Sequence, residues 1–180
     1  LDFIYFESIP HTSLEARNKV IDLAKTLKRY GNNGKLYVVN FTKIQESIYK
    51  NMDTDYMITL MRRQMYKIAT EVAKKTKSLA IVNGESIGQV ASQTLTSIKV
   101  VNDVTNYPII RPLAAYDKLE IIDISKKIGT YDISILPFED CCTIFVPTHP
   151  VINPNLCHAK EEEKKLDENL LKEAVKDLLI

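Results

Sequence analysis

Short apolar runs alternate with longer segments at helical spacing, and this alternation constrains the fold more than any other feature of the chain. Four runs have the length and composition of buried strands: Leu1–Phe6, Leu36–Asn40, Leu79–Val82 and Ile109–Ile110. The intervening segments predict amphipathic helices, the longest from about Tyr56 to Lys75. Strands that alternate with helices form βαβ units, so we predict an α/β fold with a mainly parallel sheet and helices on both faces.

Local signals indicate where the helices begin and end. Thr12–Glu15 and Asp117–Glu120 have the residue pattern of capping boxes, and Gly129 is expected to end the helix that follows the second box. A further helix is expected to open at Gly84–Ser86, directly after the third predicted strand. Residues 158–180 are predicted to form one C-terminal amphipathic helix. The apolar face of this segment comprises Leu166, Leu170, Leu171, Ala174, Val175, Leu178 and Leu179.

Composition and charge narrow the class of protein. A chain of 180 residues with 45% hydrophobic and 26% charged residues suits one globular domain, and no apolar run approaches the roughly 20 residues of a membrane span. The net charge of +1 gives no global attraction to nucleic acid, so RNA must be held by a local patch or by another domain. Three cysteines, two of them adjacent, argue against a secreted disulfide framework. Because the chain opens with Leu1 and has no signal-peptide pattern, we expect a piece of a longer, cytoplasmic protein.

Ligands of parallel α/β sheets bind at the carboxyl ends of the strands, which marks three short segments as site candidates. These segments are Tyr5–Glu7, Asn40–Phe41 and Asn83–Glu85. The last one continues into Gly84–Gln89, where glycines permit the close approach of a ligand and free N–H groups suit a phosphate or a base edge. From the pattern alone, a tight turn without a ligand is the simpler explanation.

Two adjacent arginines interrupt the long helical segment rich in methionine. Held near a strand end, the guanidinium of Arg62 or Arg63 could pair with a phosphate in a fixed fork. The alternative is an ordinary solvated helix face. Because neighbouring residues lie about 100° apart around a helix, we expect at least one of the two side chains to point into solvent.

The most informative stretch is Glu139–Cys142, which lies in a proline-rich segment, Pro137–Pro154, that is predicted to be a loop. Sulfur chemistry needs an exposed and mobile thiolate, and a proline-bounded loop favours exposure. The two acidic neighbours work against it, because negative charge raises the pKa of a thiol. Inert, part-buried thiols are one alternative. A zinc site with Cys157 and His158 is another, although adjacent cysteines fit the usual ligand spacing poorly.

Taken in order, these motifs resemble one family. Gly84–Leu95 is similar to the GESxGQVASQTL signature of the tRNA 4-thiouridine synthetases (ThiI). The resemblance covers about residues 1–150. The other matching segments are Met61–Arg63, Asn106–Leu113, Asp117–Ile122, Ile128–Ser134 and Pro137–Pro147.

The resemblance implies a fold, a reaction and a set of ligands. Family members bind ATP, with Mg²⁺ expected beside it, in a PP-loop domain of the adenine nucleotide alpha hydrolase type. They adenylate a uridine carbonyl in tRNA and displace AMP with sulfur from a cysteine persulfide, which can also supply the thiazole of thiamine. The sulfur is expected to come from a donor protein, a cysteine desulfurase, and tRNA is expected to bind mainly through regions outside this chain. We expect no metal to be held by the protein's own side chains.

The family's nucleotide contacts and acceptor cysteine can be placed on this sequence. The nucleotide contacts correspond to Tyr5, Phe6, Arg62, Gly84 and Gln93, and family members often have His-Phe where this chain has Tyr5-Phe6. The acceptor cysteine corresponds to Cys141, and Cys142 is a candidate resolving or substitute thiol.

The chain also departs from the family pattern. Family members place a strand and an S-G-G-x-D-S phosphate loop, with its helix, just before the segment that begins here, and these residues contain no such loop. The RNA-binding region that precedes that loop in the family does not occur in them either. We therefore expect a partial PP-loop domain, inactive alone, whose exposed strand edge could pair in a homodimer. The alternative is a non-catalytic nucleotide-binding or interaction domain derived from the same fold.

Overall fold

The computed structural model describes residues 1–178 and has the predicted α/β architecture. The strands and helices are β1 (Phe3–Glu7), α1 (Leu14–Leu27), β2 (Leu36–Asn40), α2 (Thr42–Asn51), α3 (Met57–Thr76), β3 (Ile81–Val82), α4 (Leu95–Asn102), β4 (Ile109–Ile110), α5 (Lys118–Lys127), α6 (Tyr131–Ser134), α7 (Leu156–Glu163) and α8 (Glu168–Lys176). Short 3-10 turns occupy Lys28–Tyr30, Thr54–Tyr56, Ala91–Gln93 and Cys141–Thr143.

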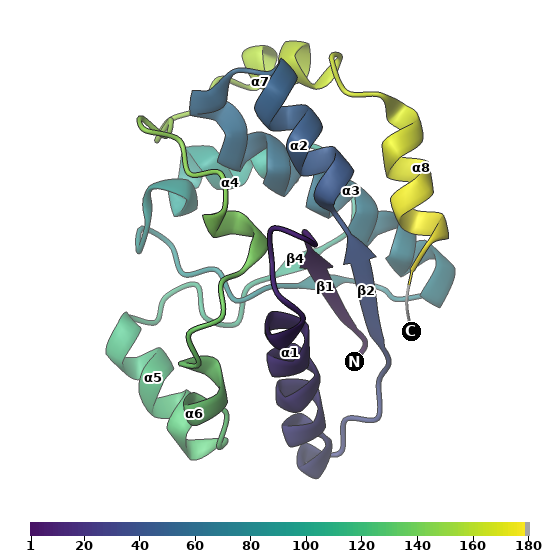
Figure 1. The fold of residues 1–180 in the computed structure, drawn as a ribbon. Coiled ribbons are helices and arrows are strands. Elements are labelled where there is room, and N and C mark those ends of the chain that lie inside the picture. The colour runs from purple at the N-terminus through teal and green to yellow at the C-terminus, as the bar shows by residue number, and fades with distance from the viewer. Residues whose placement is uncertain (179–180) are drawn as a thin grey trace.

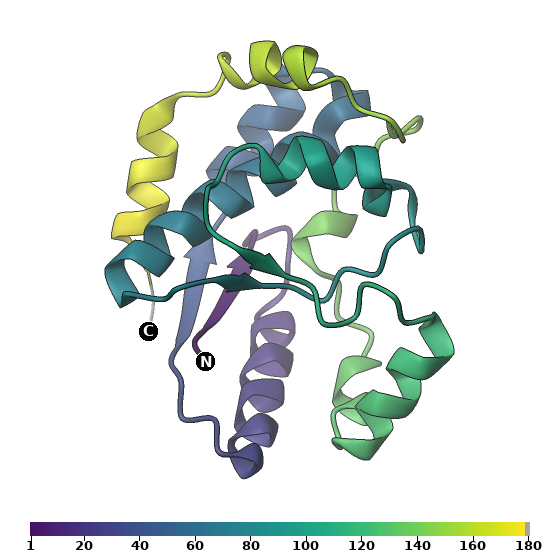
Figure 2. The same cartoon turned by 180° about the vertical axis from the view of Figure 1, so that it is seen from behind.

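The strands are parallel, as predicted, and they form two pairs. β1 pairs with β2, with Phe3 opposite Leu36, and β3 pairs with β4, with Ile81 opposite Ile109. Figures 1 and 2 show the two pairs close together but in different directions, with α1, α5 and α6 to one side and α2, α3, α4 and α7 to the other. The carboxyl ends of β1 and β2 therefore open toward the helical layer that contains α2 and α3.

Helix α3 is the centre of the core. It contacts α2, α4, α7 and α8, and most of its circumference is therefore buried. The strand β2 contributes Val39, which is fully buried, and Phe41 directly after it is fully buried as well. This packing explains why the methionine-rich segment is helical: its apolar residues face partners on several sides and not on a single stripe.

Three local predictions are wrong. The first capping box is displaced by one residue, because Ser13 caps α1 and accepts a hydrogen bond from the Ala16 amide. No helix opens at Gly84–Ser86; the chain runs through turns, with Gly88 at a φ of 80°, until Thr94 caps α4. The third strand is shorter than predicted, and Leu79 at its expected start is 89% exposed.

The expected C-terminal helix over residues 158–180 divides into α7 and α8. The break lies at Leu166, which packs into the core, and Asp167, whose side chain caps α8 by accepting from the Asn169 amide. An N-cap residue has non-helical backbone angles, so a cap within the segment ends the continuous helix. Leu179, assigned to the apolar face, lies outside the described residues.

The second capping box is confirmed and yields a testable expectation. Asp117 accepts from the Glu120 amide at 2.9 Å, and the Glu120 carboxylate accepts from the Asp117 amide at 2.8 Å. Loss of the cap leaves a helix N–H without a partner, so Asp117→Ala should lower the free energy of unfolding by about 1 kcal/mol. Urea unfolding measures this change. Asp123→Ala, on the exposed side of the same helix, is the matched control and should leave the urea midpoint unchanged.

Candidate active site

The two residues at the end of β1 face opposite sides of the strand. Phe6 packs edge-on against Phe41, with ring centroids 5.6 Å apart, so its ring belongs to the core. Tyr5 points the other way because side chains alternate along a strand. Its hydroxyl is buried without a hydrogen-bond partner among the described residues. Burial, with the negative charge of Asp140, raises the pKa of Tyr5 to about 12, so the phenol remains a hydrogen-bond donor at neutral pH.

On α3, Arg62 is held by a carboxylate from the turn that follows β3. Its guanidinium forms an ion pair with Glu85 and donates to the Ser92 carbonyl. The side chain is only 13% exposed. Burial, the first of several influences, lowers the pKa of Arg62; Arg111 acts in the same direction, and Cys142 opposes it. Arg62 therefore links the glycine-containing turn to the cysteine pair.

Glu85 is the hub of this arrangement. Its carboxylate also accepts from Arg111 Nε at 2.7 Å and from Asn83 Nδ2 at 2.7 Å. Arg111 continues to Asn102 at the end of α4, with a distance of 2.7 Å between Nη2 and Oδ1. Two guanidiniums thus share one carboxylate that is 12% exposed, which fixes the position of both arginines.

In the turn after β3, Gly84 exposes its backbone to solvent without a side chain to cover it. Gly84 is exposed, and a Cβ atom there would meet only the Leu113 side chain, at 3.9 Å. Packing therefore does not require glycine at this position, and the backbone is open to a ligand. Gln93 is joined to the same turn because its carbonyl accepts from the Gly88 amide at 3.0 Å.

Contrary to expectation, neither arginine is solvated. Arg63 is 1% exposed and pairs with Glu163 of α7, with 2.8 Å between Nη2 and Oε2. Neighbouring residues on a helix do point about 100° apart, but other parts of the chain cover α3 on the sides that both arginines face. Arg63 therefore belongs to the core, and Arg62 alone faces the candidate site.

We expected the Cys141 thiol to be exposed, but the residue is buried, with only 3% of its surface accessible. It begins a 3-10 turn, and its carbonyl accepts from Gln45 Nε2 at 2.6 Å. Gln45 is fully buried on α2 and also accepts from the Ser8 hydroxyl. These contacts fix the loop backbone from inside the protein, a restraint that the proline-rich sequence did not reveal.

Cys142, in contrast, is exposed, and its sulfur lies 4.0 Å from that of Cys141. The hydrogen bond between the two sulfurs raises the pKa of Cys141, which burial raises further. The same hydrogen bond lowers the pKa of Cys142, and the positive charge of Arg62 adds to the lowering, against opposing effects of burial and Asp140. The pair therefore keeps a proton on Cys141 and favours a thiolate on Cys142.

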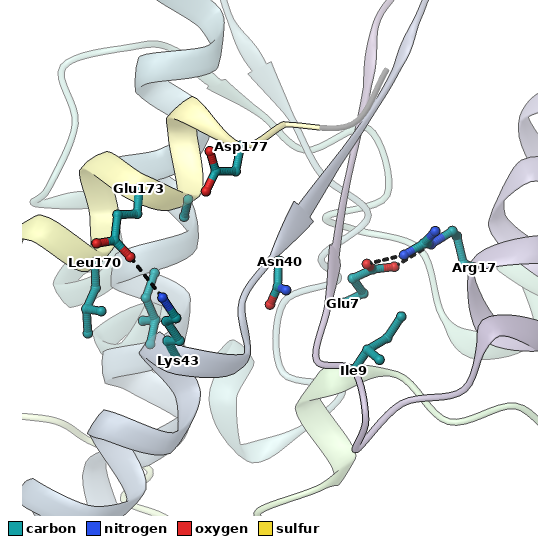
Figure 3. Close-up of a pocket in the computed structure, with 10 residues that line it drawn as sticks. Glu7, Ile9, Arg17, Asn40, Lys43, Leu170, Glu173 and Asp177 are labelled. Carbon is teal, nitrogen blue, oxygen red and sulfur yellow. Dashed lines mark hydrogen bonds and ion pairs between the residues drawn. The ribbon is translucent and has the colours of Figure 1, made fainter.

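A cavity of about 450 Å³ lies at the ends of β1 and β2, as Figure 3 shows. Its charged rim is mostly paired: Arg17 binds the buried Glu7, and Lys43 binds Glu173 of α8 at 3.1 Å. The family's nucleotide contacts and the cysteine pair do not line it. The candidate site is therefore the separate cluster that contains Tyr5, Arg62 and the cysteines.

A family model described as thiamine biosynthesis protein (ThiI) matches residues 1–168. The chain belongs to the ThiI family. A probable tRNA sulfurtransferase of Halothermothrix orenii is 53% identical over 97% of this chain and 45% of its own length. A probable tRNA sulfurtransferase of Caldanaerobacter subterraneus is 50% identical over 93% and 44%.

The ThiI-family chain also resembles a solved structure. A crystal structure of a 4-thiouridine synthetase–RNA complex with bound ATP matches with a TM-score of 0.93 and 37% identity, over 99% of this chain and 47% of that chain. The likeness confirms the PP-loop type of α/β fold. The chain thus spans about half the length of the relatives it matches.

Sequence reasoning did not predict the contacts of three residues that position the site in this ThiI-family chain, although Glu85 lies in a predicted site segment, Asn83–Glu85. Glu85 and Arg111 both lie in segments that resemble the family, yet their pairing depends on a contact across 26 residues. Gln45 lies in a segment with no motif, and its contact with Cys141 spans 96 residues. The sequence offered one signal for Gln45: it is a polar side chain on an otherwise apolar helix face. A buried amide of this kind needs a hydrogen-bond partner.

The alternative zinc site has no counterpart in the described part of the chain. Residues 1–178 contain no group of three or more His, Cys, Asp or Glu side chains placed to hold a metal ion. His158 instead lies 3.0 Å from Asp53, measured between Nε2 and Oδ2, and its ring packs edge-on against Tyr56. None of the helices within the described residues is long and apolar enough to cross a membrane.

Proposed function

We propose that the whole protein of which this chain is part is a tRNA uracil 4-sulfurtransferase, and that the chain supplies its nucleotide core and its reactive thiols. One observation carries the proposal: the cysteine pair lies close enough to Tyr5 and Arg62, two of the expected nucleotide contacts, for Cys141 to influence the pKa of Tyr5 and Cys142 that of Arg62. Sulfur transfer to an activated carbonyl requires this proximity between thiol and nucleotide. The family and the ATP-bound relative support the same reaction.

The residues of the site suit an adenine nucleotide. The buried, unpartnered hydroxyl of Tyr5 is a donor that awaits an acceptor, and Gly84 offers backbone that a base edge can approach. Arg62 adds a fixed positive charge for a phosphate. In this proposal Tyr5, Phe6, Arg62, Gly84 and Gln93 hold ATP, with Phe6 contributing its backbone because its ring packs on Phe41.

Bound ATP, with its Mg²⁺, would supply the AMP group that makes the uridine oxygen a leaving group. The protein's part is to hold a sulfur nucleophile beside that position and to keep the thiolate form available. Cys141 and Cys142 fill this role, with sulfur delivered as a persulfide by a cysteine desulfurase. The same persulfide would feed the thiazole of thiamine, and tRNA would be held mainly by other regions of the protein.

The test is a deletion strain complemented with full-length protein. Mass spectrometry of its tRNA nucleosides should show no 4-thiouridine in the deletion, restoration by the natural gene, and no restoration by Cys141→Ser/Cys142→Ser. The double variant should still bind ATP in calorimetry, because the nucleotide contacts remain. Normal thiolation by the double variant would refute the proposal. ATP binding without any effect of the deletion on 4-thiouridine would favour a non-catalytic nucleotide-binding domain.

Two further features are part of the proposal. The free cysteines of the described chain suit the reducing cytoplasm, where the tRNA substrate would be found. Within the described residues β1 pairs on one edge only, and an open edge can recruit a second copy to form a homodimer. Sedimentation of the full-length protein as a monomer at all concentrations would exclude the homodimer.

A further inference from the structure

The two adjacent cysteines differ in the properties that decide which thiol reacts, and the difference runs against the family pattern. Cys141 occupies the family's acceptor position, yet it is buried, whereas Cys142 is exposed. We propose that Cys142 accepts the persulfide sulfur and that Cys141 is a buried positioning residue beside it. This inference rests on the sulfur-transfer function proposed above and assigns the atom that carries the sulfur.

Cys141 is held from inside the protein. Its carbonyl oxygen is bound by Gln45 at 2.6 Å, and the amide nitrogen of that glutamine also contacts the Met61 sulfur at 3.8 Å. Gln45 is fully buried and further tied to Ser8. These contacts fix the backbone of Cys141, and only 3% of the residue is accessible, so exposing its sulfur by moving the loop would break the Gln45 hydrogen bond and leave buried polar groups without partners, which is costly. A donor persulfide on another protein therefore cannot readily reach this sulfur.

Cys142 has both access and activation. The sulfur of Cys141 lies 4.0 Å from that of Cys142, and the hydrogen bond between the two lowers the pKa of Cys142. The guanidinium of Arg62 stabilises the same charge through space, and Asp140 opposes it. A thiolate is the nucleophilic form of cysteine, so the exposed member of the pair is also the more reactive one.

The loading step balances without an outside oxidant or reductant. The Cys142 thiolate attacks the outer sulfur of a donor persulfide, R–S–S–H, and a new bond forms between the two sulfurs. The bond between that outer sulfur and the donor sulfur breaks, and its electron pair leaves with the donor as R–S⁻. The transferred sulfur keeps its hydrogen, Cys142 becomes a persulfide, and Cys141 remains a thiol.

The position of Cys142 also connects loading with delivery. Burial has the larger effect on the pKa of Arg62 and lowers it, while the charge of the Cys142 sulfur raises it. The same guanidinium binds Glu85 and the Ser92 carbonyl of the turn after β3. A sulfur atom loaded on Cys142 is therefore within electrostatic range of a side chain proposed to contact ATP. No movement of the buried Cys141 is required to bring the sulfur to the nucleotide.

The experiment uses the full-length protein, incubated with glutathione persulfide and analysed by tandem mass spectrometry for the gain of one sulfur atom. Fragment ions should locate that sulfur on Cys142 in the natural protein and in Cys141→Ser. Cys142→Ser should reduce the loaded fraction about tenfold or more, because no other activated thiol is exposed at the site. Cys157→Ser, which removes an exposed free cysteine elsewhere, is the matched control and should load normally.

The possible outcomes separate this inference from the proposed function. ATP binding by Cys142→Ser would show that the variant is folded, so loss of loading in it supports the inference. Sulfur located on Cys141, with loading retained in Cys142→Ser, would overturn the inference while leaving the sulfurtransferase function intact. Absence of loading on both cysteines in a protein that still thiolates tRNA would also overturn it. Absence of loading together with absence of thiolation would refute the proposed function as well.

Discussion

Glu85→Ala should be one of the two most damaging single substitutions in this chain, because it removes the carboxylate shared by Arg62 and Arg111. Both guanidiniums are largely buried, with side-chain exposures of 13% and 12%. Removing one partner of a buried ion pair leaves uncompensated charge and typically costs about 3–5 kcal/mol. We therefore expect the free energy of unfolding to fall by about this amount, as measured by urea unfolding.

The same substitution should impair function beyond its effect on stability. Without Glu85, Arg62 and Arg111 repel each other, and Arg62 loses the contact that fixes it beside Cys142. Misplacement of a positioning group by about 1 Å costs about a hundredfold in rate, so the proposed function predicts a similar loss of tRNA thiolation by the full-length protein below its unfolding temperature. Glu85→Gln, which keeps the shape and one acceptor oxygen, should be less damaging in both measurements.

Glu71→Ala is the matched control for Glu85→Ala. Glu71 lies on α3 and, within the described residues, pairs with the exposed Lys74, 2.7 Å away. Exposed pairs on a helix contribute little, so this variant should unfold and thiolate like the natural protein. If Glu85→Ala were equally harmless, the two arginines would not depend on the shared carboxylate, and the positional role of Glu85 would have to be abandoned.

The sequence predicted the elements of the fold better than it predicted their surroundings. The alternation of strands and helices and the second capping box depend on local patterns, and these predictions are confirmed. The helix expected at Gly84 failed because a glycine pattern that resembles a helix start is instead a turn, whose Gly88 has a positive φ. The helix begins instead after Thr94, which has the residue type of an N-cap and whose side chain accepts from the Ser97 amide.

The residues assigned to the candidate site remain a prediction, and their geometry was not predictable from the sequence. The resemblance to one family assembled residues from β1, α3, the turn after β3 and the cysteine loop, and the structure brings these segments together. Burial could not be anticipated in the same way. Gln45 of α2 binds the carbonyl of the buried Cys141, and α4 and α7 supply the partners of the buried Arg63. Such long-range contacts leave no periodic pattern in the sequence.

The second large effect is expected at Arg63, which joins three helices inside the protein. From α3 it donates to the Val100 carbonyl of α4 and pairs with Glu163 of α7 at 2.8 Å. Asp103 lies farther away, at 3.7 Å. Arg63→Met keeps much of the volume but removes the closest cation of the Glu163 carboxylate, which then keeps only Gln64 at 2.6 Å and Lys67 at 3.2 Å, so we expect a loss of about 3–5 kcal/mol in the free energy of unfolding.

The double variant Arg63→Met/Glu163→Leu separates charge from packing. Replacing both members of a buried ion pair with apolar residues of similar size is often neutral or stabilising, so the double variant should recover most of the stability that Arg63→Met loses. Lys164→Met, which disrupts an exposed pair with Glu161, is the matched control and should not change the urea midpoint. A double variant as unstable as the sum of its single changes would show that Arg63 acts through packing and not through its charge.

The pH dependence of stability provides an independent test of the same pair. Burial opposes ionisation of Glu163, but hydrogen bonds and charges from Arg63 and Lys67 outweigh it and hold the pKa of Glu163 below its ordinary value of 4.5. A carboxyl with a depressed folded-state pKa contributes stability that is complete above pH 4.5 and is lost as the pH falls through the folded-state pKa. The natural protein should therefore lose more stability than the double variant when urea unfolding is repeated below pH 4.5. Arg62 of the candidate site lies on the same helix, α3, as Arg63. If the natural protein and the double variant lost equal stability in acid, the Arg63–Glu163 ion pair would not be what holds α3 in place.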